Sequence, residues 1–94
     1  MELEFIKTFL KVDFDDDDRI IALMADVAEQ YITAAVGSCN YEDARVRILA
    51  LVIITELYEK RSYSVEKAGA KAQYTIRSII AQLQAEQEMM EDDA

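Results

Sequence analysis

Histidine and proline are absent from this sequence of 94 residues, and glycine occurs only twice, at Gly37 and Gly69. β-Sheets need many tight turns, for which glycine and proline are the usual residues, whereas helices need only a few connections. The scarcity of both residue types therefore predicts an all-α fold, a small four-helix domain. A chain of this length can bury one modest core, so we expect a single domain over residues 1–94.

The lack of histidine also excludes several kinds of active site. Neither a Ser-His-Asp triad nor a Glu-x-x-His di-metal site can be built without it. Cys39 is the only cysteine, so it can form no disulfide within the chain, and no histidine is present to activate its thiol. Glycine-rich phosphate-binding loops are missing as well. We therefore expect no catalytic residue, no metal site and no cofactor, and thus a protein that is not an enzyme.

Long apolar runs and a basic N-terminal leader are missing too. The longest apolar run covers residues 48–54, far short of the roughly 20 residues that span a bilayer. The first ten residues lack the basic start and the cleavage site of a signal peptide. These features predict a soluble protein of the cytoplasm.

Apolar residues at helical spacing predict four helices. The first is expected over about residues 2–10 and the second over about 16–36. The third should begin near residues 41–43 and run to about 61, and the fourth carries Ile76, Ile79, Ile80 and Leu83. Gly37 should end the second helix, because a left-handed residue commonly follows a helix and glycine adopts that conformation most easily. The apolar stripe of the second helix is predicted to consist of Ile20, Met24, Val27, Ala28, Tyr31 and Ala35.

The third predicted helix is apolar on all sides over residues 48–54, which indicates a central helix covered by the others. Residues 62–72 show no apolar stripe and contain Gly69, so we expect a loop or a loosely held arm there. The acidic residues 86–94 are expected to form a frayed C-terminal tail.

A run of aspartates precedes the second helix. Asp15, Asp16 and Asp17 are typical helix-capping residues, because carboxylates accept hydrogen bonds from the first-turn N–H groups and are favoured by the helix dipole. A calcium loop is the alternative, because three aspartates fall at its positions one, three and five. That loop requires glycine at position six and glutamate at position twelve, where this sequence has Asp18 and Met24. Capping is therefore the favoured interpretation.

The formal net charge is −9, and its sign changes along the chain. Residues 1–40 carry nine acidic and three basic side chains, residues 41–77 carry five and seven, and residues 78–94 carry five and none. An acidic chain gains no counterion-release affinity for DNA, so we expect no specific DNA binding. The basic middle either balances charge within one chain or contacts a neighbouring subunit head to tail. For the second alternative the candidate interface residues are Arg45, Arg47, Glu59 and Arg61.

Several short motifs at the helix ends follow one another in an order that is found in a known family. The first predicted helix ends in a hydrophobic-Lys-hydrophobic-Asp step at residues 10–13, and an aspartate-rich turn follows at residues 16–18. The second helix carries the pair Tyr31 and Ile32 before Gly37. The third ends in Leu57, Tyr58, Glu59, Lys60 and Arg61, similar to an aromatic-Tyr-Glu-Asn-Arg signature, with Leu57 and Lys60 as departures.

The last helix, TIRSIIAQLQ, is similar to a closing Val-x-x-Leu-Leu helix. Together these motifs resemble the tailed-phage head–tail connector family. The resemblance implies a structural virion protein of a phage or prophage, made in the bacterial cytoplasm and placed at the head–tail junction. It implies a ring of identical subunits that binds under the portal protein, extends the DNA channel and docks the tail or a stopper protein. DNA then passes without specific binding, and no membrane is involved.

Charge alone permits a different function. A small acidic domain could be a DNA mimic, whose negative surface occupies the basic groove of one nucleic-acid-binding partner. This alternative predicts a monomer or dimer with salt-sensitive binding, whereas the connector predicts higher-order rings.

Overall fold

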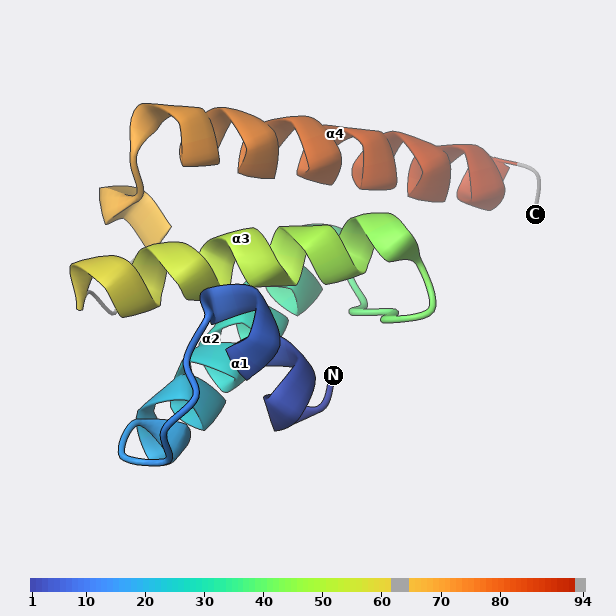
Figure 1. Cartoon of the computed structure of the whole chain (residues 1–94). Helices are drawn as coiled ribbons and strands as arrows, with labels where there is room; N and C mark the ends of the chain where they lie inside the picture. Colours follow the sequence, from blue (N-terminus) through green and yellow to red (C-terminus); the bar gives the residue numbers. More distant parts are fainter. Residues whose placement is uncertain (62–64, 93–94) are drawn as a thin grey trace.

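The structure, a computed structural model, describes residues 1–61 and 65–92. It contains four α-helices and one short 3-10 turn, with no strand in the described residues (Figure 1). In chain order the elements are α1 (Leu3–Leu10), α2 (Asp18–Val36), α3 (Ala44–Lys60), η1 (Val65–Lys67) and α4 (Ala70–Asp92). The predicted all-α fold is confirmed.

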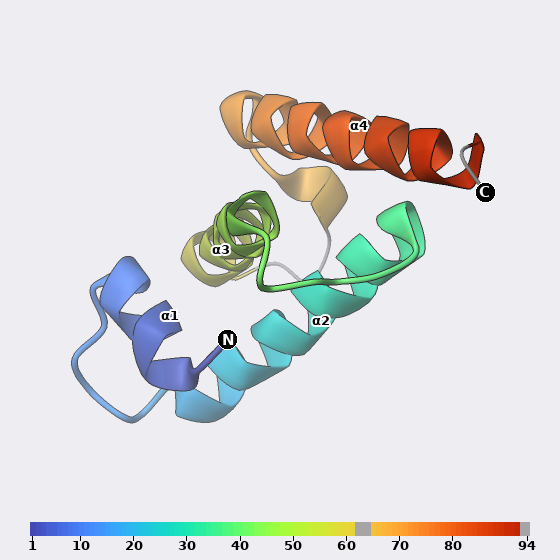
Figure 2. The ribbon, with the colours of Figure 1, turned by 90° about the vertical axis from the view of Figure 1, so that its right-hand side faces the viewer.

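Helix α3 lies at the centre of the arrangement. Figure 1 shows α4 on one side of it and α1 and α2 on the other, and the end-on view in Figure 2 shows that α1 and α2 flank it separately. It packs against all three helices. The prediction of a central third helix is therefore confirmed.

One residue of the apolar run 48–54 departs from that prediction. Leu51 and Ile54 are buried, with 3% and 0% of their surface exposed, but Ile48 is 46% exposed. Figure 2 shows no helix beside α3 on the side between α1 and α4, and Ile48 is one of the exposed residues of α3. An apolar run thus places a helix at the centre without burying its whole circumference.

Left-handed residues and a capping side chain set the ends of the helices. Gly37 has a φ of 96°, and its N–H donates to the Thr33 carbonyl at 2.8 Å, so the predicted end of α2 is confirmed. Lys11 ends α1 in a left-handed conformation with a φ of 62°. Asp43 precedes α3, and its carboxylate caps the helix by accepting the Arg45 N–H at 2.9 Å.

The connection between α3 and α4 is shorter than expected. Residues 62–64 of the predicted loop lie outside the described part of the chain. η1 follows, and α4 already begins at Ala70. The Gly69 N–H donates to Glu56 Oε2 at 3.1 Å, which ties the start of α4 to α3.

The acidic segment that was expected to fray is helical through Asp92. Two contacts hold α4 beyond its apolar stripe. Gln84 Nε2 donates to the Ala35 carbonyl at 2.8 Å, and Arg45 forms an ion pair with Glu86 at 2.7 Å. Residues 86–92 are therefore a continuation of α4 and not an irregular tail, and the two contacts fix the start of this stretch.

The buried side of α2 is rotated slightly from the predicted stripe. Met24 and Ala28 are buried as expected, whereas Tyr31 is 36% exposed. Ile21 and Ile32, which the prediction omitted, are fully buried. In α4 the predicted stripe is confirmed: Ile76 and Leu83 are buried, and Ile79 and Ile80 are partly buried against the same core. No helix in the described part of the chain has the length and apolar character needed to cross a membrane.

Candidate functional site

Three polar clusters join the ends of different helices, and two of them connect residues more than 40 positions apart in sequence. The Lys7 cluster contains Lys7, Asp15 and Asp18; the Asp17 cluster contains Asp17, Tyr58 and Arg61; the Arg45 cluster contains Asp43, Arg45 and Glu86. The first two fix the aspartate-rich turn, and the third fixes α4. Among the described residues, no group of three or more Asp, Glu or Cys side chains is arranged to hold a metal ion.

The Lys7 cluster places a cation inside the aspartate-rich turn. Lys7 Nζ lies 3.0 Å from Asp15 Oδ1 and 2.9 Å from Asp18 Oδ1, and the Lys7 side chain is only 5% exposed. Hydrogen bonds to Asp18 and Asp15 raise the pKa of Lys7, so the ammonium stays charged despite its burial. The turn thus carries its own counterion.

This counterion predicts the response to calcium. Because the Lys7 ammonium already contacts Asp15 and Asp18, a divalent cation would have to displace it. We expect millimolar calcium to leave the thermal midpoint unchanged, as measured by circular dichroism with magnesium as the matched control. A stabilisation of several degrees by calcium, lost in Asp15→Asn, would show that the turn is a calcium site after all.

The Asp17 cluster changes the role predicted for this aspartate. Asp17 occupies the cap position of α2, yet its side chain makes no capping hydrogen bond. Its Oδ2 instead accepts from the Tyr58 hydroxyl at 2.6 Å and from Arg61 Nη2 at 3.1 Å. The Arg61 guanidinium lies over the Tyr58 ring, 4.8 Å from its centre. Asp17 is therefore the cap residue by position, as predicted, but it makes no side-chain capping bond; Asp15 contacts Lys7, and Asp16 is exposed.

The same cluster joins two of the motifs that carry the family resemblance. Asp17 belongs to the aspartate-rich turn, and Tyr58 and Arg61 belong to the motif at the end of α3, 41 and 44 residues further along the chain. The contact fixes the start of α2 against the end of α3. These motif residues therefore have a structural role within one subunit.

The Asp17 cluster predicts a loss of stability in acid. Hydrogen bonding from Tyr58, and then Arg61, lowers the pKa of Asp17 below its ordinary value of 3.8. The folded state thus binds this proton less readily than the unfolded state, so the stabilisation is present above about pH 4 and is lost as the pH falls through the lowered pKa. We expect Asp17→Asn to lower the thermal midpoint at pH 7. The difference in thermal midpoint between this variant and wild type should become smaller as the pH falls to about 3.

The exposed neighbour Asp16 provides the matched control for this prediction. Asp16→Asn makes the same charge change without touching Tyr58 or Arg61. Its thermal midpoint should follow that of wild type across the pH range. If the difference in thermal midpoint between wild type and Asp17→Asn stayed constant with pH, the contact of an ionised Asp17 with Tyr58 and Arg61 would not be the source of the stabilisation.

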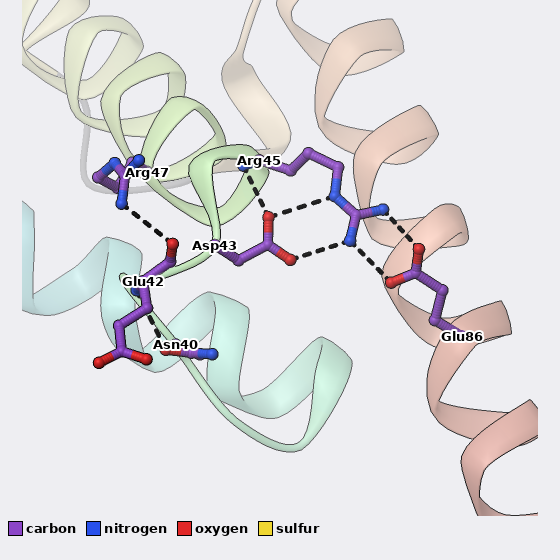
Figure 3. Close-up of polar contacts among 6 residues, drawn as sticks. All are labelled: Asn40, Glu42, Asp43, Arg45, Arg47 and Glu86. Atoms are coloured by element: carbon purple, nitrogen blue, oxygen red, sulfur yellow. Dashed lines mark hydrogen bonds and ion pairs between the residues drawn. The ribbon is translucent and has the colours of Figure 1, made fainter.

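The Arg45 cluster holds α4 against the start of α3 (Figure 3). Arg45 Nη2 lies 2.9 Å from Asp43 Oδ2 and 2.7 Å from Glu86 Oε2, and Nη1 donates to Glu86 Oε1 at 2.8 Å. The two-bond contact with Glu86 is the strong geometry for a guanidinium and a carboxylate. Arg45 lowers the pKa values of both Asp43 and Glu86. Glu86 therefore serves as an anchor of α4.

The four predicted interface residues lie in different surroundings. Arg45 is in the cluster just described, and Arg61 pairs with Asp17. Arg47 Nη1 donates to the Tyr41 carbonyl at 2.6 Å and to the Glu42 carbonyl at 3.2 Å, and Figure 3 shows the second of these contacts. Glu59 is exposed and has no ion pair in the described part of the chain. The three arginines thus have partners within one chain, while their contact with a neighbouring subunit stays a prediction.

Sequence reasoning missed Lys7 and Glu86, although helical spacing could have found both. Lys7 lies four residues after Leu3 and three before Leu10, which places it on the apolar side of α1. Glu86 lies three residues after Leu83 on the continuation of the buried side of α4. A charged residue at such a position indicates a buried or partly buried ion pair.

The fold and its polar clusters define a small helical structural domain, in which the charged residues with described contacts chiefly stabilise the packing. The chain matches the family described as phage gp6-like head-tail connector protein over residues 1–90. It therefore belongs to that family, and its role is that of a structural connector protein of phages. Comparisons with curated proteins and with solved structures give no significant match.

Proposed function

We propose that the chain is one subunit of a ring that binds beneath the portal protein of a tailed phage, extends the DNA channel and docks the tail or a stopper protein. The ring joins the virion at the head–tail junction after assembly in the bacterial cytoplasm. The observation that carries this proposal is the family match over residues 1–90, nearly the full length of the chain.

The charge of the chain suits a conduit for DNA. A net charge of −9 repels phosphate, so DNA can pass without being held. The three polar clusters also suit a ring segment, because each fixes one helix end against another. A subunit that keeps its shape can repeat the same contact at every position of a closed ring.

Light scattering and electron microscopy test the proposal directly. The purified chain is mixed with the portal protein of the same phage, and the particles are imaged and weighed. We expect rings attached to the portal. The alternative, a DNA mimic, would be supported by a different result. The chain would then not bind the portal, and it would bind one basic protein as a monomer or dimer with an affinity that falls steeply in salt.

The predicted interface needs variants that leave the fold intact. Reversing Arg45, Arg47 or Arg61 would also break contacts within the subunit, so loss of rings would be ambiguous. Glu59→Arg avoids this problem because Glu59 is exposed and forms no ion pair among the described residues. If Glu59 faces a neighbour, this variant should form fewer rings while its thermal midpoint stays unchanged.

A further inference from the structure

An open hollow lies on α3 where the start of α4 passes it beside α1. It encloses about 270 Å³ and is lined mainly by Phe9, Val52, Thr55, Lys71, Ala72 and Thr75. Phe9 is 45% exposed although its ring is apolar. Glu56, the acidic residue of the lining, is already paired with Lys60 at 2.9 Å and with the Gly69 N–H. The hollow therefore presents an apolar floor and one cation, Lys71.

The charges of α4 are arranged against its own helix dipole. A helix is stabilised by acidic residues in its first turn and basic residues in its last, and α4 has neither. Lys71 instead lies in the first turn, and Glu86 and Glu88 lie near the end. Arg45 neutralises Glu86, but in the described part of the chain neither Lys71 nor Glu88 has an ion-pair partner. These two charges are complementary and lie at opposite ends of one helix.

An exposed apolar residue accompanies the acidic end. Met89 follows Glu88 and is 67% exposed. Figure 1 shows that this end of α4 projects beyond the start of α3. We infer that the projecting end of α4, with Met89 and Glu88, docks into the hollow beside Phe9 and Lys71 of a second copy of the chain.

Geometry excludes the chain itself as the occupant. Residues 71 and 89 are separated by eighteen residues of one continuous helix, which is about 27 Å at 1.5 Å per residue. A straight helix cannot fold its end back onto its own start. A second copy brings the acidic end to the basic end, and the contact is head to tail, so each subunit uses one hollow and one helix end. This inference rests on the proposed function in taking the partner to be another subunit of the ring.

Cross-linking tests the contact. In a Cys39→Ser background, Thr75→Cys and Met89→Cys place one thiol in the hollow and one on the helix end. A short bismaleimide linker cannot join them within one chain, because 14 residues of helix separate them by about 21 Å. We expect a ladder of dimers, trimers and larger species on denaturing gels, both for the concentrated chain and for the chain bound to portal. Variants that carry only Thr75→Cys or only Met89→Cys should give dimers at most.

A charge exchange provides the second test. Lys71→Glu and Glu88→Lys should each weaken self-association roughly fivefold, as light scattering measures it, and the double variant should restore it. Met89→Asp should weaken it about tenfold. Lys11→Glu and Leu23→Asp, at exposed positions outside the hollow and the helix end, are the matched controls, and circular dichroism confirms that every variant folds.

The outcomes separate the two proposals. Rings on the portal without a cross-linked ladder, or without rescue by the double variant, would overturn the docking of α4 and leave the connector function standing. A chain that forms no assembly even with portal would overturn both.

Discussion

Leu51→Asp or Ile54→Asp is expected to abolish the cooperative thermal transition of the domain. Both side chains are buried in the central helix α3, at 3% and 0% exposure. Burying an unpaired carboxylate among apolar residues belongs to the most destabilising class of substitutions, on the order of 4–5 kcal/mol or more. The total stability of a domain is only about 5–15 kcal/mol. Circular dichroism should therefore show lost helicity and no sharp midpoint.

Ile48→Asp on the same helix is the matched control. Ile48 is 46% exposed, so its carboxylate can remain hydrated and the thermal midpoint should change little. A fully helical Leu51→Asp/Ile54→Asp double variant with the wild-type midpoint would refute the assignment of α3 as the core helix.

The second large effect is expected for Lys7→Glu. This change replaces the Lys7 ammonium, which is only 5% exposed, with a third carboxylate beside Asp18, which is 33% exposed, and Asp15, which is 89% exposed. An attraction thus becomes a repulsion, and the new carboxylate is itself buried. Lys7→Met removes the cation without adding an anion. We expect the thermal midpoint to fall in the order wild type, Lys7→Met, Lys7→Glu, with the last lower than wild type by at least several degrees.

Net charge must be controlled in this series, because Lys7→Glu also makes an acidic chain more acidic. Lys11→Glu makes the same change four residues away at an exposed position. Its midpoint should stay near that of wild type. Equal losses for the two variants would show that overall repulsion, not the Lys7 cluster, sets the stability.

Local patterns were sufficient to predict that the four helices form, although not the full length of α4. The spacing of Ile76, Ile79, Ile80 and Leu83 predicted α4, and Gly37 predicted the end of α2, because both signals act within a few residues. The rotation of α2 was harder to predict. Ile20 and Ile21 are adjacent and equally apolar, so only the positions of α1 and α3 decide that Ile21 is the more deeply buried.

Contacts between distant residues could not be predicted from local patterns. The sequence around Asp17 fits a helix cap, but the side chain turns to Tyr58 and Arg61, which only the packing of α2 against α3 brings near. The extension of α4 depends in the same way on Arg45, 41 residues before Glu86. Charge patterning predicted that the arginines would meet acidic groups, and the structure shows acidic partners for Arg45 and Arg61 within the same chain.

The central position of α3 has a consequence for hydrogen exchange. Its amides are covered by three other helices, so those in the middle of the helix should exchange with deuterium only through global unfolding. The last turn of α4 lies beyond the Arg45–Glu86 ion pair, at the end of the helix, and its amides should exchange through local fraying many times faster. Exchange followed by mass spectrometry should therefore rank α3 slowest. Protection of the last turn of α4 should rise when subunits assemble if that end is buried against a neighbour.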